Sequence, residues 1–562
     1  MGVMLLALLP EFFGIGVVAG NDLVFHYIRL EALAQELNLG HFPARIPYLW
    51  MDGYGYPSSI MYNDILLYFP AILRLIGFEL TTAYLWYVAL INGATVIGSY
   101  LCFSRIFSSK SIGFILCAVY SLVPYRLLDI YTRAAVGEYS AFCFFPIIAL
   151  AIWELLYEEK IGLRQSLLLA LGMTGVFSVH ILSVIVVGIG LLLVLLFGIK
   201  VVRKKRFFPV VFGAVGIFAA WNAYFLVPFL DYTLTVPMWI TGKSYGVPFS
   251  EPARNATVKQ IFDYFGSLMH EAVADSPITP GLALSLSVLF MLLLFVKKKG
   301  NRRMLFLGGS SIMLLFLISN LCPWDRIVTI LPFLKMLGVI QFSWRLMILP
   351  AVFLTLLLGE CLSVMLEIEA LKPVVRTGIY VGILLTALVV LPFQYAGSSG
   401  QRAAFRDQWD LDLYFVGSGE YMKQGSYIPQ ETATPVFHDM TGEVLGFRGT
   451  TYLISVEEAG KEAFVQIPVF NYKGYVARQE ATGEKMPVTD GENNLVKVLV
   501  PEGSSGNVLI GFQEPWYWRL AEGISFLSVI CTAFTAVWFR KGMKASTGPS
   551  TGKKRRNNPN EY

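Results

Sequence analysis

The sequence predicts a polytopic α-helical membrane protein of about twelve spans, with an extracytoplasmic β-sandwich-like domain inserted before the last span. Of its 562 residues, 55% are hydrophobic and 15% are charged, against ~45–50% and ~25% in soluble domains. The mean hydropathy is +0.59. A chain of this composition cannot bury its apolar surface in soluble cores alone, and it does not belong to the disordered, collagen-like or disulfide-scaffold classes.

The apolar runs are long enough to cross a bilayer core, which takes about 20 residues in a helix. The first run carries Pro10 and Glu11 and lacks a basic flank, which is not typical of a cleaved signal peptide, so we expect the start of a longer helix. The segment 65–78 contains Pro70 and Arg74, and we expect a re-entrant or interfacial helix there. The predicted spans are 1–19, 82–104, 109–125, 138–157, 165–180, 182–199, 207–228, 280–296, 304–321, 345–366, 374–394 and 520–540.

Lysine and arginine residues in the short loops predict the orientation. Under the twelve-span count, all loops that follow even-numbered spans are basic, and so is the tail 541–562. That side is predicted to be cytoplasmic, in the plasma membrane. The net charge of +5 is too weak to indicate nucleic-acid binding. The basic segments are 105–110, 160–164, 200–206, 297–303, 372–376 and 553–556.

The opposite, extracytoplasmic side receives the long loops of a transmembrane domain, 1–394, and a large insert, 395–519. The insert has 16 acidic and 10 basic residues, a net charge of −6. Its apolar residues alternate in four segments separated by turn residues, which indicates strands of a β-sandwich. The alternating segments are 451–456, 463–470, 495–500 and 507–512, and the long loops of the transmembrane domain are 20–81, 126–137, 229–279 and 322–344.

The first long loop contains Asp22, His26 and Arg29 at spacings i, i+4 and i+7, so a helix would place them on one face. We expect that helix to begin at Asp22 and to end at Gly40. Two interpretations stay open. Asp22 is an N-cap beside a solvated polar face, or it is an ionisable group that borders a membrane cavity, where such groups are usually functional.

The second loop contains Arg126 and Arg133, seven residues apart, which a helix would point the same way. Two guanidinium groups suit a phosphate or pyrophosphate. Glu138 opens the next span, where it is either a functional acid or an acid stabilised by a helix N-terminus. Arg345 begins the tenth span as a snorkelling cation or a phosphate ligand, and His180, between the fifth and sixth spans, is structural or functional.

Together these motifs resemble large bacterial membrane proteins of the GT-C glycosyltransferase superfamily. The resemblance covers nearly the whole chain and is greatest to the group labelled "membrane protein, 6-pyruvoyl-tetrahydropterin synthase-related", akin to YfhO-like proteins. The pterin label has no support, because the five histidines form no zinc-ligand cluster. The motifs are Asp22-x-x-x-His-x-x-Arg29, Gly40-x-Phe-Pro-x-Arg45, Gly53-Tyr-Gly-Tyr-Pro57, Pro124-Tyr-Arg126, Arg133-Ala-Ala-x-Gly-Glu138 and Gln341-Phe-x-Trp-Arg345.

The resemblance implies a transferase that moves a sugar, with inversion, from a polyprenyl-phosphate-linked donor to an extracytoplasmic glycan or envelope polymer. The general base maps onto Asp22, and a second acidic role maps onto Glu138 or Asp64. An inverting transfer needs such a base, while the leaving lipid phosphate needs cations, not an acid. The candidate cations are Arg126, Arg133 and Arg345, and the supporting residues are His26, Arg29, Asp64 and His180.

No cofactor is predicted. A divalent metal stays open but is not indicated, since no second acid stands beside Asp22. Two other functions also stay open, a transporter or flippase for lipid-linked sugars and a non-catalytic cell-envelope assembly protein. Transporters usually carry internal repeats and helices broken near the midplane, whereas this sequence places its polar motifs in the loops and has no evident repeat.

Overall fold

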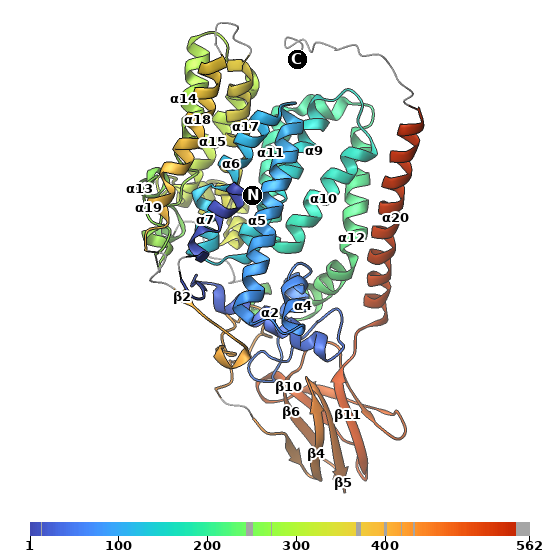
Figure 1. Cartoon of the computed structure of the whole chain (residues 1–562). Helices are drawn as coiled ribbons and strands as arrows, with labels where there is room; N and C mark the ends of the chain where they lie inside the picture. The colour runs from blue at the N-terminus through green and yellow to red at the C-terminus, as the bar shows by residue number, and fades with distance from the viewer. Residues whose placement is uncertain are drawn as a thin grey trace.

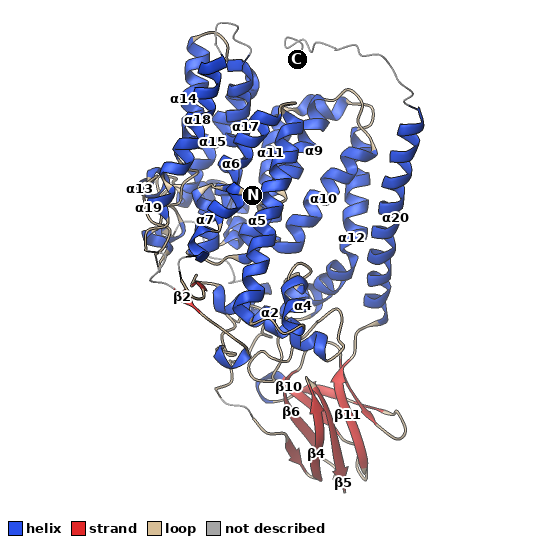
Figure 2. Cartoon of the chain, viewed as in Figure 1, coloured by secondary structure: helices blue, strands red, loops and turns tan. Residues whose placement is uncertain are grey.

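A computed structural model describes residues 1–12, 14–242, 251–270, 272–366, 373–397, 402–417, 419–430 and 433–546. Long helices form a bundle, and strands form a separate domain at one end of it (Figures 1 and 2). The predicted basic tail lies outside the described residues from 547 onwards.

Among the described residues, five helical segments are long and apolar enough to cross a membrane. A sixth is added if α6 (Lys110–Ser121) and α7 (Pro124–Tyr131), which meet at 42°, count as one bent span. The chain is thus a helical protein with five to six candidate spans, and the predicted total of twelve is not shown. The five segments are α5 (Leu80–Ile106), α8 with α9 (Val136–Tyr157), α12 (Phe207–Thr235), η7 with α17 (Ser343–Leu366) and α18 with α19 (Pro373–Gln394).

Further helices occupy the positions of other predicted spans. Three of them are apolar but only 15 to 17 residues long, which is short for a bilayer core of ~30 Å at ~1.5 Å per residue. The last predicted span lies within α20, a helix of 31 residues that packs against α12. These helices are α10 (Leu163–Val179), α11 (Ile181–Phe197), α14 (Leu282–Val296), α15 (Arg302–Ile318) and α20 (Trp516–Ser546).

The first predicted span, 1–19, is wrong. This segment forms a short helix, α1 (Gly2–Ala7), a 3₁₀ turn, η1 (Leu9–Phe12), and a strand, β1 (Val17–Val18). Pro10 cannot donate a backbone hydrogen bond to continue the helix. Strand β1 instead pairs with β2 (Arg402–Ala403), next to the insert, and Arg402 donates to the carbonyl of Gly16 at 2.8 Å.

The helix expected after Asp22 is present as α2 (Leu23–Asn38), with Asp22 at its N-cap position. The Asp22 side chain makes no capping hydrogen bond. Of the two interpretations left open for this helix, the solvated polar face is excluded, because His26 and Arg29 are buried. Two short helices of the same loop lie beside this region, α3 (Ser58–Met61) and α4 (Tyr68–Leu75), and α4 packs on α2.

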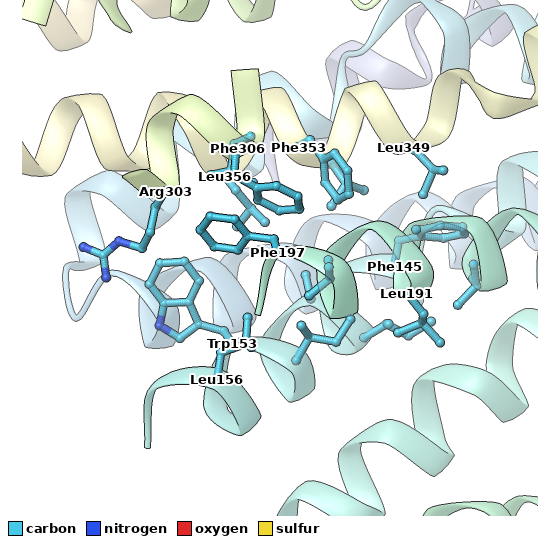
Figure 3. Close-up of a pocket in the computed structure, with 18 of the residues that line it drawn as sticks. Phe145, Trp153, Leu156, Leu191, Phe197, Arg303, Phe306, Leu349, Phe353 and Leu356 are labelled. Atoms are coloured by element: carbon cyan, nitrogen blue, oxygen red, sulfur yellow. The ribbon is translucent and has the colours of Figure 1, made fainter. Parts of the chain in front are cut away.

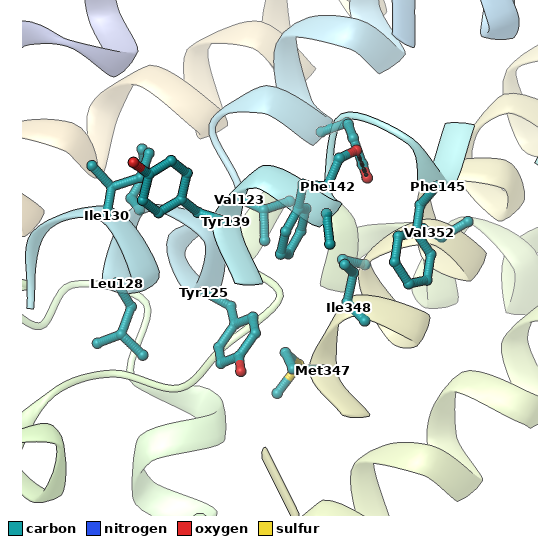
Figure 4. Packing of buried hydrophobic residues seen from close by; sticks show 14 of the residues in the cluster. Val123, Tyr125, Leu128, Ile130, Tyr139, Phe142, Phe145, Met347, Ile348 and Val352 are labelled. Atoms are coloured by element: carbon teal, nitrogen blue, oxygen red, sulfur yellow. Dashed lines mark hydrogen bonds between the residues drawn. The ribbon is translucent and has the colours of Figure 1, made fainter. Parts of the chain in front are cut away.

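A continuous apolar core joins the helices that carry the predicted site residues. Figure 4 shows Tyr125 of α7, Phe142 and Phe145 near the start of α9, and Met347 and Ile348 at the start of α17 within this cluster. Burial of each large apolar side chain contributes roughly 1.5–3 kcal/mol. The helix ends near Glu138 and Arg345 are therefore held by dense packing from several directions.

The C-terminal region forms two antiparallel sheets, and all four predicted strands are present. Strand β5 alternates as expected, with Tyr452, Ile454 and Val456 buried. One core cluster includes residues from both sheets and from the first long loop, among them Trp50 and Tyr56. The four-stranded sheet has the order β3 (Val436–His438), β6 (Phe464–Phe470), β10 (Leu495–Leu499), β9 (Val488–Asp490), and the five-stranded sheet has the order β4 (Thr441–Arg448), β5 (Thr451–Glu457), β11 (Gly506–Phe512), β7 (Tyr475–Gln479), β8 (Lys485–Met486).

We call the two sheets together the β-domain, and we define its entry segment as residues 411–417 and 419–424. This entry segment attaches the β-domain to the end of the bundle. The backbone of this segment accepts hydrogen bonds from Met51 at 2.9 Å, from Trp239 at 3.0 Å and from Ile240 at 2.9 Å. Arg45 of the first long loop also pairs with Glu514, at the end of the β-domain, at 3.2 Å. These contacts close a space between the bundle and the β-domain.

Candidate functional site

A cavity of about 940 Å³ lies where the helix ends meet the entry segment. Small-molecule sites occupy roughly 300–1,000 Å³, so the cavity has room for a sugar and a phosphate group. It is lined by parts of α2, α8 (Val136–Ala141), α11, α12 and η7 (Ser343–Met347), and by the entry segment. Six predicted site residues line it: Asp22, His26, Arg133, Glu138, His180 and Arg345.

Two distant loops are joined at this cavity by their backbones. The Asn21 N–H donates to the carbonyl of Thr132 at 3.0 Å, and the Asp22 N–H donates to the carbonyl of Arg133 at 2.7 Å. Gly20 permits this approach, because a Cβ there would lie 2.5 Å from the backbone nitrogen of Ala134. Asp22 and Arg133 are therefore held in a fixed relation.

The Asp22 carboxylate faces the cavity. Its side chain is exposed to the cavity space, and it accepts no hydrogen bond from any described residue. Protein lines much of this partly open space, and the resulting partial desolvation raises the pKa of Asp22 above its ordinary value, although the nearby Arg133 and Arg345 oppose the shift. A carboxylate with open lone pairs and a raised pKa is suited to accept a proton.

Glu138 is buried in a network of donors on the cavity wall. Arg133 Nη1 donates to Glu138 Oε2 at 2.7 Å and to Asp129 Oδ1 at 2.6 Å. Arg345 Nε lies 3.2 Å from the same Glu138 oxygen, and the Tyr125 hydroxyl donates to the other. Glu138 is thus fully engaged, and it holds the two arginines in place instead of presenting a free base to the cavity.

The two cavity arginines are surrounded by at least as many acidic groups. Asp22, Asp129 and Glu138 supply three acidic groups against the two guanidinium groups of Arg133 and Arg345. Each guanidinium has five N–H donors, so it can contact an anionic ligand without leaving its carboxylate. Sequence reasoning missed Asp129, although its i, i+4 spacing to Arg133 is the usual signal of a helical ion pair.

Arg126 is not brought to the cavity. Its side chain is 0% exposed, and it donates to the carbonyl of Ser121 at 3.0 Å and to Asn92 Oδ1 at 2.8 Å. The expectation that it points the same way as Arg133 fails because α7 ends at Tyr131, two residues before Arg133. The helical spacing of seven residues does not hold beyond that helix end.

Of the remaining predicted residues, Arg29 and Asp64 lie behind the cavity surface, whereas His180 is part of it. Arg29 pairs with Asp64, both buried, and neither lines the cavity. His180 lines it, and its Nδ1 lies 2.8 Å from the hydroxyl of Ser183. Sequence reasoning also missed Glu420 and other lining residues of the entry segment, because that segment has no periodic pattern and only the tertiary fold brings it to the site.

No group of three or more His, Cys, Asp or Glu residues within the described ranges could hold a metal ion. A second, narrow groove lies between α9 (Phe145–Tyr157), α11, α15 and α17, and it contains none of the predicted site residues. Figure 3 shows that aromatic and aliphatic side chains line it, with Arg303 at one end. Its apolar lining offers nothing for proton transfer.

Comparisons with known proteins add a distant structural similarity. No family model matches the chain, and no curated protein matches it. A solved structure, the cryo-EM structure of arabinofuranosyltransferase AftD from mycobacteria, matches with a TM-score of 0.37 and 14% sequence identity. The match covers 71% of this chain and 26% of that one, so this chain spans about a quarter of AftD. The chemistry of the cavity therefore carries the functional assignment.

Proposed function

We propose that the chain is a GT-C-like membrane glycosyltransferase, which moves a sugar from a polyprenyl-phosphate-linked donor to a hydroxyl of an extracytoplasmic glycan or envelope polymer. The observation that supports it best is the Asp22 carboxylate, unpaired among the described residues and open to the cavity, with its backbone bonded to that of Arg133. A base and a cation fixed relative to one another are what this transfer requires.

The proposed reaction is a single displacement with inversion. The acceptor hydroxyl oxygen forms a bond to the anomeric carbon while the bond from that carbon to the phosphate oxygen breaks. Asp22 takes the hydroxyl proton, and the lipid phosphate leaves with the electron pair. Arg133 and Arg345 stabilise the developing negative charge. A positioned base typically contributes ~10²–10⁴-fold to the rate.

In this proposal Glu138 acts through the arginines, which it orients, and Arg126 serves the fold. The prenyl chain lies among the helices, in a bundle of about twelve spans in the plasma membrane. The β-domain, 395–519, is extracytoplasmic and closes the cavity from that side, while the loops rich in lysine and arginine face the cytoplasm. Such an orientation follows the positive-inside rule.

A deletion strain that is complemented with single variants tests the proposal. Asp22→Asn keeps the size of the side chain and removes its basicity, and Asp325→Asn, at an exposed site outside the cavity, is the matched control. We expect Asp22→Asn to accumulate the lipid-linked sugar and to lose the glycan product by ~10²-fold or more, while the control restores both.

The measurement is mass spectrometry of cell-envelope glycans and lipid-linked sugars, at matched protein levels. Equal products from wild type and Asp22→Asn would refute the transferase. That result would favour a flippase or an assembly protein, since neither needs proton transfer at Asp22.

A further inference from the structure

His26 stands one helical turn after Asp22 on α2, at the wall of the cavity. Its side chain is almost completely buried, and its Nδ1 lies 3.1 Å from Arg29 Nη1. A guanidinium group has only donors. His26 Nδ1 must therefore accept this hydrogen bond, which leaves the ring proton on Nε2.

Arg29 cannot easily turn away from His26. Its Nε donates to Asp64 Oδ1 at 3.1 Å, and its Nη2 donates to the same oxygen and to the carbonyl of Asn63. The Tyr62 ring lies 3.8 Å from the guanidinium carbon. Every edge of the guanidinium is occupied, so the tautomer of His26 is set by a rigid, buried network.

The same surroundings keep His26 neutral. Burial lowers the pKa of His26 well below its ordinary value, and the Arg29 guanidinium and His180 shift it in the same direction. The charged and titratable groups around the ring are Arg29, Asp64, Tyr62, His180 and Asp22. Protonation of His26 would place a second positive charge 3.1 Å from Arg29. The buried Asp64 could not offset this repulsion, since its carboxylate is already paired with Arg29.

His26 lines the same cavity as Arg133 and Arg345. The Tyr62 ring packs edge-on against the His26 ring, with centroids 6.4 Å apart. The Tyr62 hydroxyl in turn crowds Gly137, where a Cβ would lie 2.1 Å from it. Gly137 precedes Glu138, which binds Arg133 and Arg345. Tyr62 thus connects the wall around His26 with the segment that carries these two cations, and all of these residues line one cavity.

We infer that His26 is a permanently neutral hydrogen-bond donor, through Nε2–H, to a phosphate oxygen of the cavity ligand, and that Arg29 and Asp64 are positioning residues which fix its tautomer. The identity of the ligand rests on the proposed function. A neutral donor adds a third hydrogen bond beside Arg133 and Arg345 without adding charge. Because its acceptor nitrogen is occupied, His26 does not compete with Asp22 for the proton.

Nitrogen NMR of the full-length protein in lipid nanodiscs tests the tautomer. The chain has only five histidines, and ¹⁵N-histidine labelling with a His26→Gln variant identifies the signal of His26. We expect an Nε2-protonated, neutral ring at every pH from 5 to 8. A signal of the Nδ1-protonated form, or a titration near the ordinary histidine pKa of ~6.5, would overturn the inference. Both are measured on the wild-type protein, and the variant serves only to assign the signal.

The donor role is tested with farnesyl phosphate as the probe and farnesol as the matched control without phosphate. We expect farnesyl phosphate to shift the Nε2 signal of His26, and farnesol to leave it unchanged. The half-exposed His41, outside the cavity, is the internal control. An Nε2 signal that neither compound moves, or that both move equally, would overturn the donor role.

These readouts do not depend on turnover. If Asp22→Asn cells make normal glycans while farnesyl phosphate still shifts His26, the transferase proposal fails and the phosphate site stands. If the glycans collapse but the His26 signal is unmoved, only the inference about His26 fails.

Discussion

Replacement of Gly20 by alanine tests whether the pairing of the 20–22 and 132–134 backbones holds the site together. The new Cβ would lie 2.5 Å from the nitrogen and 2.6 Å from the Cβ of Ala134. The nitrogen is a backbone atom and the Cβ is bonded directly to the backbone, so neither can move aside as the end of a flexible side chain could. The overlap is relieved only if the two segments separate.

Separation would break the hydrogen bonds from the Asn21 and Asp22 N–H groups. Each hydrogen bond is worth ~0.5–1.5 kcal/mol. If the segments instead stay together, the hydrogen bonds are kept but the steric overlap costs ~1–3 kcal/mol. Whether the hydrogen bonds break or the overlap is tolerated, we expect the unfolding free energy to fall by about 2 kcal/mol. At ~2–4 °C per kcal/mol in a large domain, the unfolding midpoint falls by about 4–8 °C.

A thiol-reactive dye follows the unfolding of the purified protein, because five of its six cysteines are buried and only Cys531 is exposed. The matched control is Gly188→Ala in α11, where nothing lies within 4 Å of the added Cβ. Alanine favours a helix over glycine by ~0.5–1 kcal/mol, so this control holds or raises the midpoint. Equal midpoints for the two variants would refute the proposed role of the pairing.

Three further predictions concern the surroundings of the site. The Glu36 carboxylate, 2.7 Å from His41, raises the pKa of His41. The ion pair therefore stabilises the folded protein fully below the unfolded pKa of ~6.5, and this stabilisation is lost as the pH rises through the higher folded pKa. The unfolding midpoint of the wild type should fall between these two pKa values, whereas that of His41→Gln should stay flat. Arg126→Met should lower the midpoint, because it leaves buried acceptors unpaired, yet the folded protein should keep its response to farnesyl phosphate, and loss of that response alone would contradict a purely structural Arg126. Arg45→Met removes the cation nearest to Glu514 but leaves Arg519, 3.3 Å from that carboxylate, so we expect a cost below the ~3–5 kcal/mol of a buried charge left unpaired. Limited proteolysis should release the β-domain faster, and an unchanged cleavage rate would argue against this fastening.

Much of the architecture follows from local patterns in the sequence. Every predicted apolar run except the first coincides with a helix, since a continuous apolar stretch favours a helix in a bilayer. The alternation in 451–456 predicted β5, because side chains of a strand point to opposite faces. The same reasoning predicted α2, and it brought Asp22 and His26 together one turn apart.

Only the tertiary structure decided how these elements meet. The segment 1–19 is broken because β1 finds a partner in β2, almost 400 residues away in the chain, and no local pattern encodes that pairing. Arg126 and Arg133 point to different places because α7 ends at Tyr131, between them. The pairing of Asp22 with Arg133 and the tautomer of His26 depend on contacts between segments far apart in sequence, and such contacts form only when the chain is packed. The sequence by itself therefore determined the class of protein and the residue types at the site, while packing selected which of them face the cavity.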